Sequence, residues 1–217
     1  MCGIAGVYSV NDSRHSILEK NANKLIHRGP DFQKTEKINE NLSFYHSRLS
    51  IVDLNPRSNQ PFHDLESGNS IIFNGEIYNY KELQKLLPNR NFRTSSDTEV
   101  LLYLISDIGI DKALNSCNGM FSFAFWDNNQ SCITLGRDRL GQKPLFYYHN
   151  DECLAFASEA KLLLDFVPDK KVNHKAVVNY LFEIVVGANE YSFFEDIVQL
   201  KNASYKTFKL KGEKVEE

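Results

Sequence analysis

Apolar and polar positions along the chain fall into short runs, some with a strand-like period of two and others with helical spacing. Most of the short apolar or alternating runs are bounded by glycine, asparagine, aspartate or serine, which is typical of strands between turns. Strands are predicted at residues 2–10, 42–49, 70–73, 120–126, 132–136, 146–148, 153–157 and 205–210. The strand at 70–73 runs into Asn74-Gly75, a pair that favours a tight turn.

Helical spacing marks other segments. Apolar residues recur three and four positions apart between Asp97 and Ile108, and Ser13 is expected to cap a helix that runs to about Ile26. Helices are predicted at residues 13–26, 79–87, 97–108, 159–166 and 172–186. Together the patterns predict an α+β protein with many antiparallel strands and two sets of helices.

Length and composition exclude several classes of protein. The 217 residues fit one large domain or one domain with an appendage, and the formal net charge of −3 argues against a general nucleic-acid binder. No apolar run approaches the ~20 residues of a membrane span, and the apolar N-terminus lacks the basic segment of a signal peptide. Neither nucleic acid nor a membrane is therefore an expected partner.

The four cysteines are Cys2, Cys117, Cys132 and Cys153. They form no CxxC pair and have no metal-ligand spacing with the six histidines, so no metal site is expected. A reduced, cytoplasmic compartment is the expectation. The last three cysteines are expected to be buried, unreactive thiols.

Cys2 follows Met1 directly, and a small side chain at position 2 permits removal of the initiator methionine. An N-terminal cysteine carries a thiol nucleophile and a free α-amine whose pKa lies near 7.7–8.0 in the absence of perturbation. The alternative is that Cys2 is a small buried residue of the first strand. Asn74-Gly75 offers a side-chain amide and a backbone N–H side by side, which suits an oxyanion hole, although a plain hairpin turn is the competing interpretation.

Seven motifs occur in one order along the chain. They are CGIAG (2–6), HRGPD (27–31), RLSIVD (48–53), NGEIYN (74–79), SDTE (96–99), GMFSFA (119–124) and GRDRLGQKPL (136–145). Together they resemble the class II glutamine amidotransferase domain of glutamine-hydrolysing asparagine synthetases over roughly residues 2–210. The resemblance implies a four-layer αββα sandwich of antiparallel sheets, the fold of N-terminal nucleophile hydrolases.

The resemblance also implies an activity, the hydrolysis of L-glutamine to L-glutamate and ammonia. Cys2 would attack the side-chain amide after loss of Met1 and form a γ-glutamyl thioester. Asn74 and Gly75 match the oxyanion donors, and Arg48 and Asp97 match the groups that hold the substrate carboxylate and ammonium. The implied substrate-binding residues are Arg48, Leu49, Ser50, Ile51, Val52, Glu76 and Asp97.

Structural roles remain the alternatives at several positions. Arg48 is equally typical of a surface ion pair and Asp97 of a helix N-cap. His27 and Arg28 belong to a family motif, but Gly29-Pro30 is expected mainly to end a helix and no direct catalytic role is expected for His27 or Arg28. His46 is expected to pack within the fold. Residues 121, 123 and 125 form an aromatic stripe expected in the core, while Arg137, Asp138 and Gly141 are expected to form a structural loop held by ion pairing.

No phosphate loop is recognisable in the sequence. The chain is therefore divided into a core at 2–170 and a C-terminal helix and strand at 171–217 that lead toward an absent synthetase domain. ATP and Mg are expected only in that missing domain, and no cofactor in this chain. The expected partners are L-glutamine and the synthetase domain or subunit that receives ammonia, with a homodimer left open.

The segments at 185–189 and 200–204 depart from the usual family pattern, so the acceptor of the ammonia remains open. Aspartate is one candidate, and another carboxylate such as a surface-polysaccharide sugar is a second. The sugar-phosphate and phosphoribosyl kinds of class II enzyme are disfavoured by the RLSIVD motif. A catalytically silent module that binds an amino acid or a partner is the non-enzyme alternative.

Overall fold

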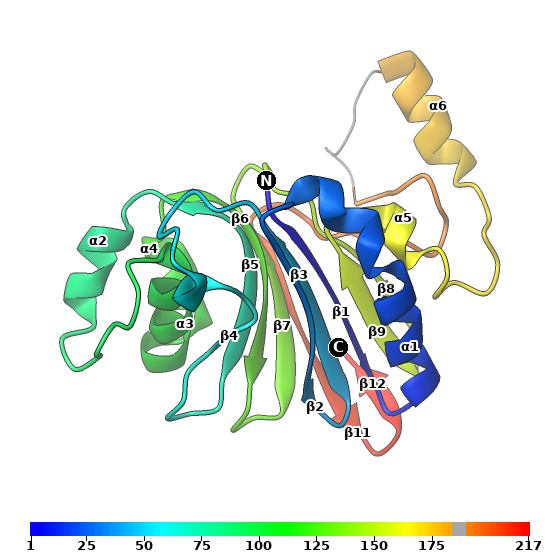
Figure 1. Ribbon diagram of the computed structural model, residues 1–217. Helices are drawn as coiled ribbons and strands as arrows, with labels where there is room; N and C mark the ends of the chain where they lie inside the picture. Colours follow the sequence, from blue (N-terminus) through cyan, green and yellow to red (C-terminus); the bar gives the residue numbers. More distant parts are fainter. Residues whose placement is uncertain (184–189) are drawn as a thin grey trace.

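The computed structural model describes residues 1–183 and 190–217, which form two six-stranded sheets stacked between layers of helices (Figure 1). The first sheet contains, in spatial order, β10 (Val198–Gln199), β8 (Phe146–His149), β9 (Cys153–Ala157), β1 (Gly3–Ser9), β3 (Leu42–Arg48) and β2 (Phe32–Asn39). The second contains β12 (Lys214–Glu216), β11 (Ser204–Lys211), β7 (Cys132–Arg137), β6 (Gly119–Asp127), β5 (Ser70–Ile77) and β4 (Phe62–His63). Neighbouring strands in both sheets pair antiparallel.

Three hydrophobic clusters hold these layers together. The central cluster lies between the sheets and includes Tyr8 and Phe156 from the first sheet and Trp126 and Phe208 from the second. The predicted aromatic stripe at residues 121, 123 and 125 is buried on the other face of the second sheet, against helices. Because both faces of each sheet are covered, β1 and β7 are buried along their whole length. The predicted αββα sandwich is therefore confirmed.

Helices cover the outer face of each sheet (Figure 1). The second sheet is covered by α2 (Tyr80–Leu83), α3 (Asp97–Ile108) and α4 (Ile110–Ser116), and the first by α1 (Asp12–Asn21) and α5 (Ala160–Leu163). Three short 3-10 segments join these elements: η1 (Ala22–Arg28), η2 (Pro56–Ser58) and η3 (Gln84–Leu86). No helix in the described residues is long and apolar enough to cross a membrane.

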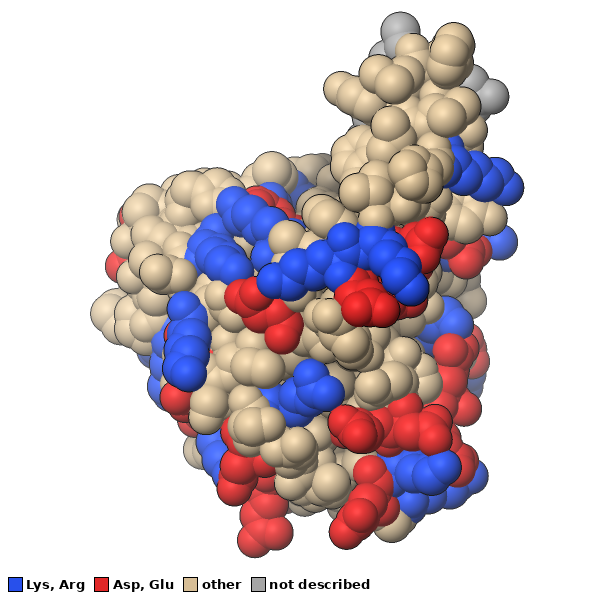
Figure 2. Space-filling model, turned by 90° about the vertical axis from the view of Figure 1, so that its right-hand side faces the viewer, with Lys and Arg blue, Asp and Glu red and all other residues tan. Residues whose placement is uncertain are grey.

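The remaining helix, α6 (His174–Glu183), projects from the sandwich. In the view of Figure 2, the projecting part has few charged side chains, whereas basic and acidic side chains are interspersed over the body below it. Several of its apolar side chains face solvent, and Phe182 is 82% exposed. The predicted helix extended to residue 186, and its last three residues lie outside the described part of the chain.

Strands from the C-terminal segment complete both sheets. Tyr205 pairs with Gly136 where β11 joins β7, and Val198 pairs with Tyr147 where β10 joins β8. The proposed division of the chain at residue 170 stays a prediction. The described residues after 190 nevertheless contact both sheets of the sandwich.

Some local predictions were wrong at the level of single residues. The side chain of Asn11, not Ser13, caps α1, since it accepts a hydrogen bond from the Ser13 amide at 3.0 Å. Asn74-Gly75 forms no turn, because β5 continues through the pair to Ile77 and stays in register with β6. Strand β2 was missed because it is an edge strand with polar side chains, a pattern typical of exposed edges.

Candidate active site

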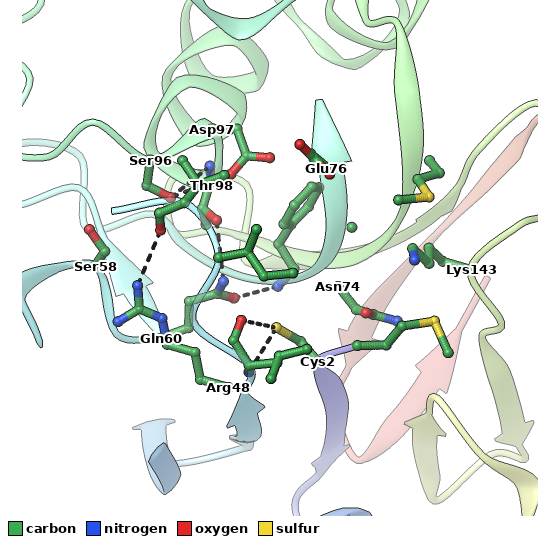
Figure 3. Close-up of a pocket in the computed structure, with 17 residues that line it drawn as sticks. Cys2, Arg48, Ser58, Gln60, Asn74, Glu76, Ser96, Asp97, Thr98 and Lys143 are labelled. Carbon is green, nitrogen blue, oxygen red and sulfur yellow. Dashed lines mark hydrogen bonds between the residues drawn. The ribbon is translucent and has the colours of Figure 1, made fainter. Parts of the chain in front are cut away.

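A cavity of about 260 Å³ opens where the two sheets meet α3 and the loop after β3 (Figure 3). The structure brings nine of the ten predicted site residues to this cavity, namely Cys2, Arg48, Leu49, Ile51, Val52, Asn74, Gly75, Glu76 and Asp97. Ser50 is the exception, because it does not line the cavity and its amide instead donates to the Asp31 carboxylate at 2.7 Å.

Cys2 lies immediately before β1, and the pairing of β1 with β3 places it beside Leu49. The Leu49 amide donates to the Cys2 sulfur at 3.4 Å, and the thiol donates to the Leu49 carbonyl at 3.6 Å. Burial raises the pKa of the Cys2 thiol, against the effect of the Leu49 amide and nearby positive charges. Met1 precedes Cys2, so the α-amine of Cys2 becomes free only when Met1 is removed.

Arg28 holds the backbone of Cys2 from η1. Its Nε donates to the Cys2 carbonyl at 3.0 Å, and its Nη1 contacts the Glu159 carboxylate at 2.9 Å. His27 contacts the same carboxylate at 2.8 Å. No direct catalytic role was expected for His27 or Arg28, and the contact of Arg28 with the backbone of Cys2 was missed.

Asn74 faces Cys2 from the second sheet (Figure 3), and Gly75 lines the same cavity. Asn74 is 1% exposed, and its Nδ2 has no hydrogen-bond partner among the described residues. Such a buried donor costs free energy unless a ligand or water accepts its hydrogen bond. Gly75 is required by close packing, since a Cβ there would lie 2.3 Å from the Met120 carbonyl oxygen. The arrangement therefore leaves an amide donor available inside the cavity.

Arg48 is only 5% exposed, so the alternative of a surface ion pair is wrong. Its guanidinium donates to oxygens of the loop after β3: the carbonyls of Val52 (3.4 Å), Asp53 (2.5 Å) and Asn55 (3.2 Å) and the side chain of Asn59 (2.6 Å). It thereby orders the loop that forms one wall of the cavity. A carboxylate that bound Arg48 would have to replace some of these neutral acceptors.

Asp97 is the first residue of α3, and Ser96 provides the cap by accepting from the Thr98 amide at 3.2 Å. The interpretation of Asp97 as the N-cap is therefore wrong. The Asp97 carboxylate accepts from the Ile77 amide at 2.9 Å and is 5% exposed. Burial, with the charge of Glu76 acting in the same direction, raises the pKa of Asp97 to about 6. No cation lies within ion-pair distance of it among the described residues, so it suits an incoming ammonium.

Several cavity residues were missed by sequence reasoning. Gln60 accepts a hydrogen bond from the Phe73 amide at 2.6 Å and donates to Thr98 at 3.2 Å, which ties the loop to β5 and α3. Ser58 also lines the cavity, and no local pattern marks either residue. Lys143 lines it too and lies within the GRDRLGQKPL motif, which was the available signal.

Other expected structural roles are borne out in part. Cys117, Cys132 and Cys153 are buried free thiols, and burial raises the pKa of each. His46 is fully buried and packs within the fold, with Nε2 3.3 Å from the Phe73 carbonyl oxygen. Burial lowers the pKa of His46 to about 3, so it stays neutral at ordinary pH. No group of three or more metal-binding side chains occurs in the described ranges.

The model of a glutamine amidotransferase domain family matches residues 1–217. Asparagine synthetase [glutamine-hydrolyzing] 2 of Bacillus subtilis (strain 168) is 42% identical over 168 residues, 75% of this chain and 22% of that protein. Asparagine synthetase B [glutamine-hydrolyzing] of Escherichia coli (strain K12) is 36% identical over 169 residues, 76% of this chain and 30% of that protein. The chain thus spans less than a third of either relative. The resemblance predicted from the sequence motifs is confirmed.

The fold also matches a solved structure. The glutamine phosphoribosylpyrophosphate amidotransferase of B. subtilis superposes with a TM-score of 0.61 at 21% identity, over 75% of this chain and 43% of that chain. At this identity the match supports the fold alone.

Proposed function

This chain belongs to the glutamine amidotransferase domain family, an enzyme domain, and we propose that it hydrolyses L-glutamine to L-glutamate and ammonia through a thioester on Cys2. The observation that carries the proposal is the meeting of a buried thiol and an unpartnered amide donor in one cavity. Cys2 and Asn74 supply these groups, and Asp97 lies in the same cavity as a carboxylate for the substrate ammonium.

The proposed reaction begins when the α-amine of Cys2, freed by removal of Met1, accepts the thiol proton. The thiolate then attacks the side-chain amide carbon of glutamine, and the carbonyl electron pair moves onto the oxygen. Asn74 Nδ2 and the Gly75 N–H are the proposed donors to this oxyanion. Its collapse breaks the C–N bond, and the α-ammonium returns its proton to the leaving ammonia.

A γ-glutamyl thioester remains on Cys2 in this scheme. Water attacks it with the α-amine as general base, the oxyanion forms again in the same hole, and the C–S bond breaks to release glutamate. The thiol and the amine return to their starting states, so no other co-reactant is needed.

The direct test is release of glutamate and ammonia from glutamine by a chain whose loss of Met1 is verified by intact mass. Cys2→Ala should remove the activity, and Cys132→Ala is the matched control because Cys132 is buried away from the cavity. Equal activity in Cys2→Ala and the unsubstituted chain would contradict the mechanism. Absence of activity in the processed chain and in a complex with a synthetase domain would favour the silent module.

Arg48 is the proposed binder of the substrate α-carboxylate. Arg48→Ala should raise KM for glutamine far more than for an amide that lacks the α-carboxylate. Equal losses with both substrates would instead assign Arg48 to ordering the loop, through the four contacts it makes there.

We further propose that the ammonia serves an asparagine-synthetase-like amidation on a synthetase domain or subunit, which would hold ATP and Mg. The names of the relatives support this acceptor, although another carboxylate remains the alternative. Measuring glutamine-dependent amidation of aspartate by the full protein distinguishes them. We also propose that the protein is cytoplasmic and forms a homodimer. Light scattering, which measures the mass in solution, tests the homodimer.

A further inference from the structure

Lys143 is a buried cation without a visible partner. It lies between β7 and β8, is 6% exposed, and lines the same cavity as Cys2. Within the described ranges, no carboxylate lies within ion-pair distance of its ammonium, and no acceptor forms a hydrogen bond with it. Its Nζ is not among the fully enclosed polar atoms, so an anion formed in the cavity can reach the ammonium.

The loop that carries Lys143 is tightly fixed. The Asp138 carboxylate accepts from the amides of Phe121 (3.2 Å), Leu140 (3.0 Å), Gln142 (3.0 Å) and Lys143 (3.0 Å). Arg137 donates to the carbonyl oxygens of Lys143 (3.0 Å), Gly141 (2.6 Å) and Leu200 (2.7 Å). The loop therefore has the structural role that was expected. It is fixed by hydrogen bonds to backbone amides and carbonyls, however, and not by the ion pairing that was predicted.

In Figure 3, Lys143 lies on the opposite side of Cys2 and Asn74 from Arg48. Two cations from different elements thus line the cavity that contains the nucleophile, one on β3 and one on the loop after β7. The charged groups that face Cys2 or interact with it are the amino terminus, Arg28, Arg48, Glu76, Asp97 and Lys143.

These groups differ in how far their charge is balanced. Arg28 is paired with Glu159 at 2.9 Å, and Arg48 is surrounded by neutral oxygens. Glu76 and Asp97 disfavour a second negative charge in the cavity. Burial lowers the pKa of Lys143, and the positive charge of Arg28 acts in the same direction, whereas the negative charges of Cys2, Asp138 and Glu76 oppose the shift. A thiolate on Cys2 is the neighbouring anion that would form during the proposed reaction.

We propose that Lys143 is a positioning residue whose ammonium stabilises the Cys2 thiolate when the thiol proton moves to the α-amine. The inference rests on the proposed function, because it assigns Lys143 to the nucleophile of that reaction. In this step the S–H bond of Cys2 breaks and an N–H bond forms on its α-amine. The electron pair of the S–H bond stays on sulfur, so no oxidant or reductant is needed. Lys143 itself neither gains nor loses a proton.

The test is the pH dependence of Cys2 alkylation by iodoacetamide, followed by mass spectrometry of the Cys2 peptide in chains that have lost Met1. Burial slows alkylation of the other three cysteines, because each is at most 4% exposed. Lys143→Met removes the charge at similar length, and Lys143→Arg retains it. Lys20→Met, at an exposed position in the last turn of α1, is the control.

Lys143→Met should raise the midpoint of alkylation by about one pH unit and slow the reaction at pH 7 about tenfold. Lys143→Arg and Lys20→Met should retain the unsubstituted midpoint. An unchanged midpoint in Lys143→Met overturns the proposal, and so does a rise in KM for glutamine without a shift of the midpoint. If Lys143→Met fails to fold, as judged by circular dichroism, Lys143→Gln replaces it in the same comparison.

Alkylation needs no turnover of glutamine, so the two proposals fail separately. A chain without glutaminase activity whose Lys143→Met midpoint shifts would refute the proposed function alone. An active chain whose midpoint does not shift would refute the role of Lys143 alone.

Discussion

Replacing Asp97 with asparagine should stabilise the folded chain near neutral pH while weakening its use of glutamine. The Asp97 carboxyl is 5% exposed, and burial raises its pKa from 3.8 to about 6. The folded chain therefore holds a proton that the unfolded chain releases as pH rises between these values. Its free energy of unfolding falls through that window, by up to about 3 kcal/mol for a shift of about two units.

Asparagine keeps an oxygen that accepts from the Ile77 amide, as Asp97 does at 2.9 Å, but it carries no charge at any pH. Asp97→Asn should therefore raise the free energy of unfolding by about 1–3 kcal/mol at pH 8 and by under about 1 kcal/mol at pH 4, as measured by urea unfolding. The control is Asp169→Asn, whose side chain is 73% exposed and should show no such difference. A gain of the same size at both pH values would refute the reasoning.

Three further substitutions test other parts of the site. Asn74→Ala should lower kcat for glutamine hydrolysis about 10²–10³-fold with a smaller change in KM, and an unchanged kcat would remove Asn74 from the oxyanion hole. Gly75→Ala should cost about 2 kcal/mol or more in urea unfolding, because its Cβ would meet the Met120 carbonyl at 2.3 Å; a neutral effect would show that β6 yields easily. Glu159→Gln should lower the free energy of unfolding by about 1–3 kcal/mol at pH 7 and by little at pH 2. Hydrogen bonds from Lys161, Arg28 and His27 lower the pKa of Glu159 to about 2, so its contribution is lost as pH falls through that value. An equal cost at both pH values would contradict the last expectation.

The strands that could be predicted are those whose pattern follows from burial. The central strands β1, β6 and β7 are apolar nearly throughout because helices and the opposing sheet cover both faces. The edge strand β2 carries polar side chains, and β4 and β10 have two residues each. These segments are strands because they pair with a neighbouring strand, and their own sequences give little sign of it. Local periodicity contains no information about such pairing.

Asn74-Gly75 illustrates how tertiary structure overrides local preference. The pair favours a turn in isolation, yet Asn74 lies opposite Ser122 and Gly75 opposite Phe121 in a continuous ladder. The glycine is needed because the backbone of β6 comes too close for a side chain. The motif resemblance predicts a functional role for the pair, whereas the prediction of a turn was wrong about its structure.

The site residues likewise divide into those that sequence motifs predicted and those whose contacts depend on the tertiary structure. Cys2, Arg48 and Asp97 were predicted from motifs, and the structure brings them to one cavity. The guanidinium contacts of Arg48 with its own loop could not be predicted, because they depend on how residues 52–59 fold back over β3. Gln60 was missed for a similar reason, since its contacts join elements distant in sequence.

Three groups that line the cavity have no counter-charge or, in the case of the amide, no hydrogen-bond acceptor within the described residues. Asn74 offers a donor without an acceptor, Asp97 a carboxylate without a cation, and Lys143 an ammonium without an anion. Each is complementary to a charge that the proposed reaction brings or creates: an oxyanion, a substrate ammonium and a thiolate.

Ser58 Oγ is a further buried atom that lines the cavity without a hydrogen-bond partner, and Tyr45 Oη and His46 Nδ1 are two such atoms elsewhere in the described residues. Neither Tyr45 nor His46 lines the cavity, so they have no access to a ligand there. Asn74, Asp97 and Lys143 differ because they converge from β5, α3 and the loop after β7 on a single space beside Cys2. Convergence of a free amide donor and of charges of both signs on one thiol is better explained by a reacting ligand than by imperfect packing.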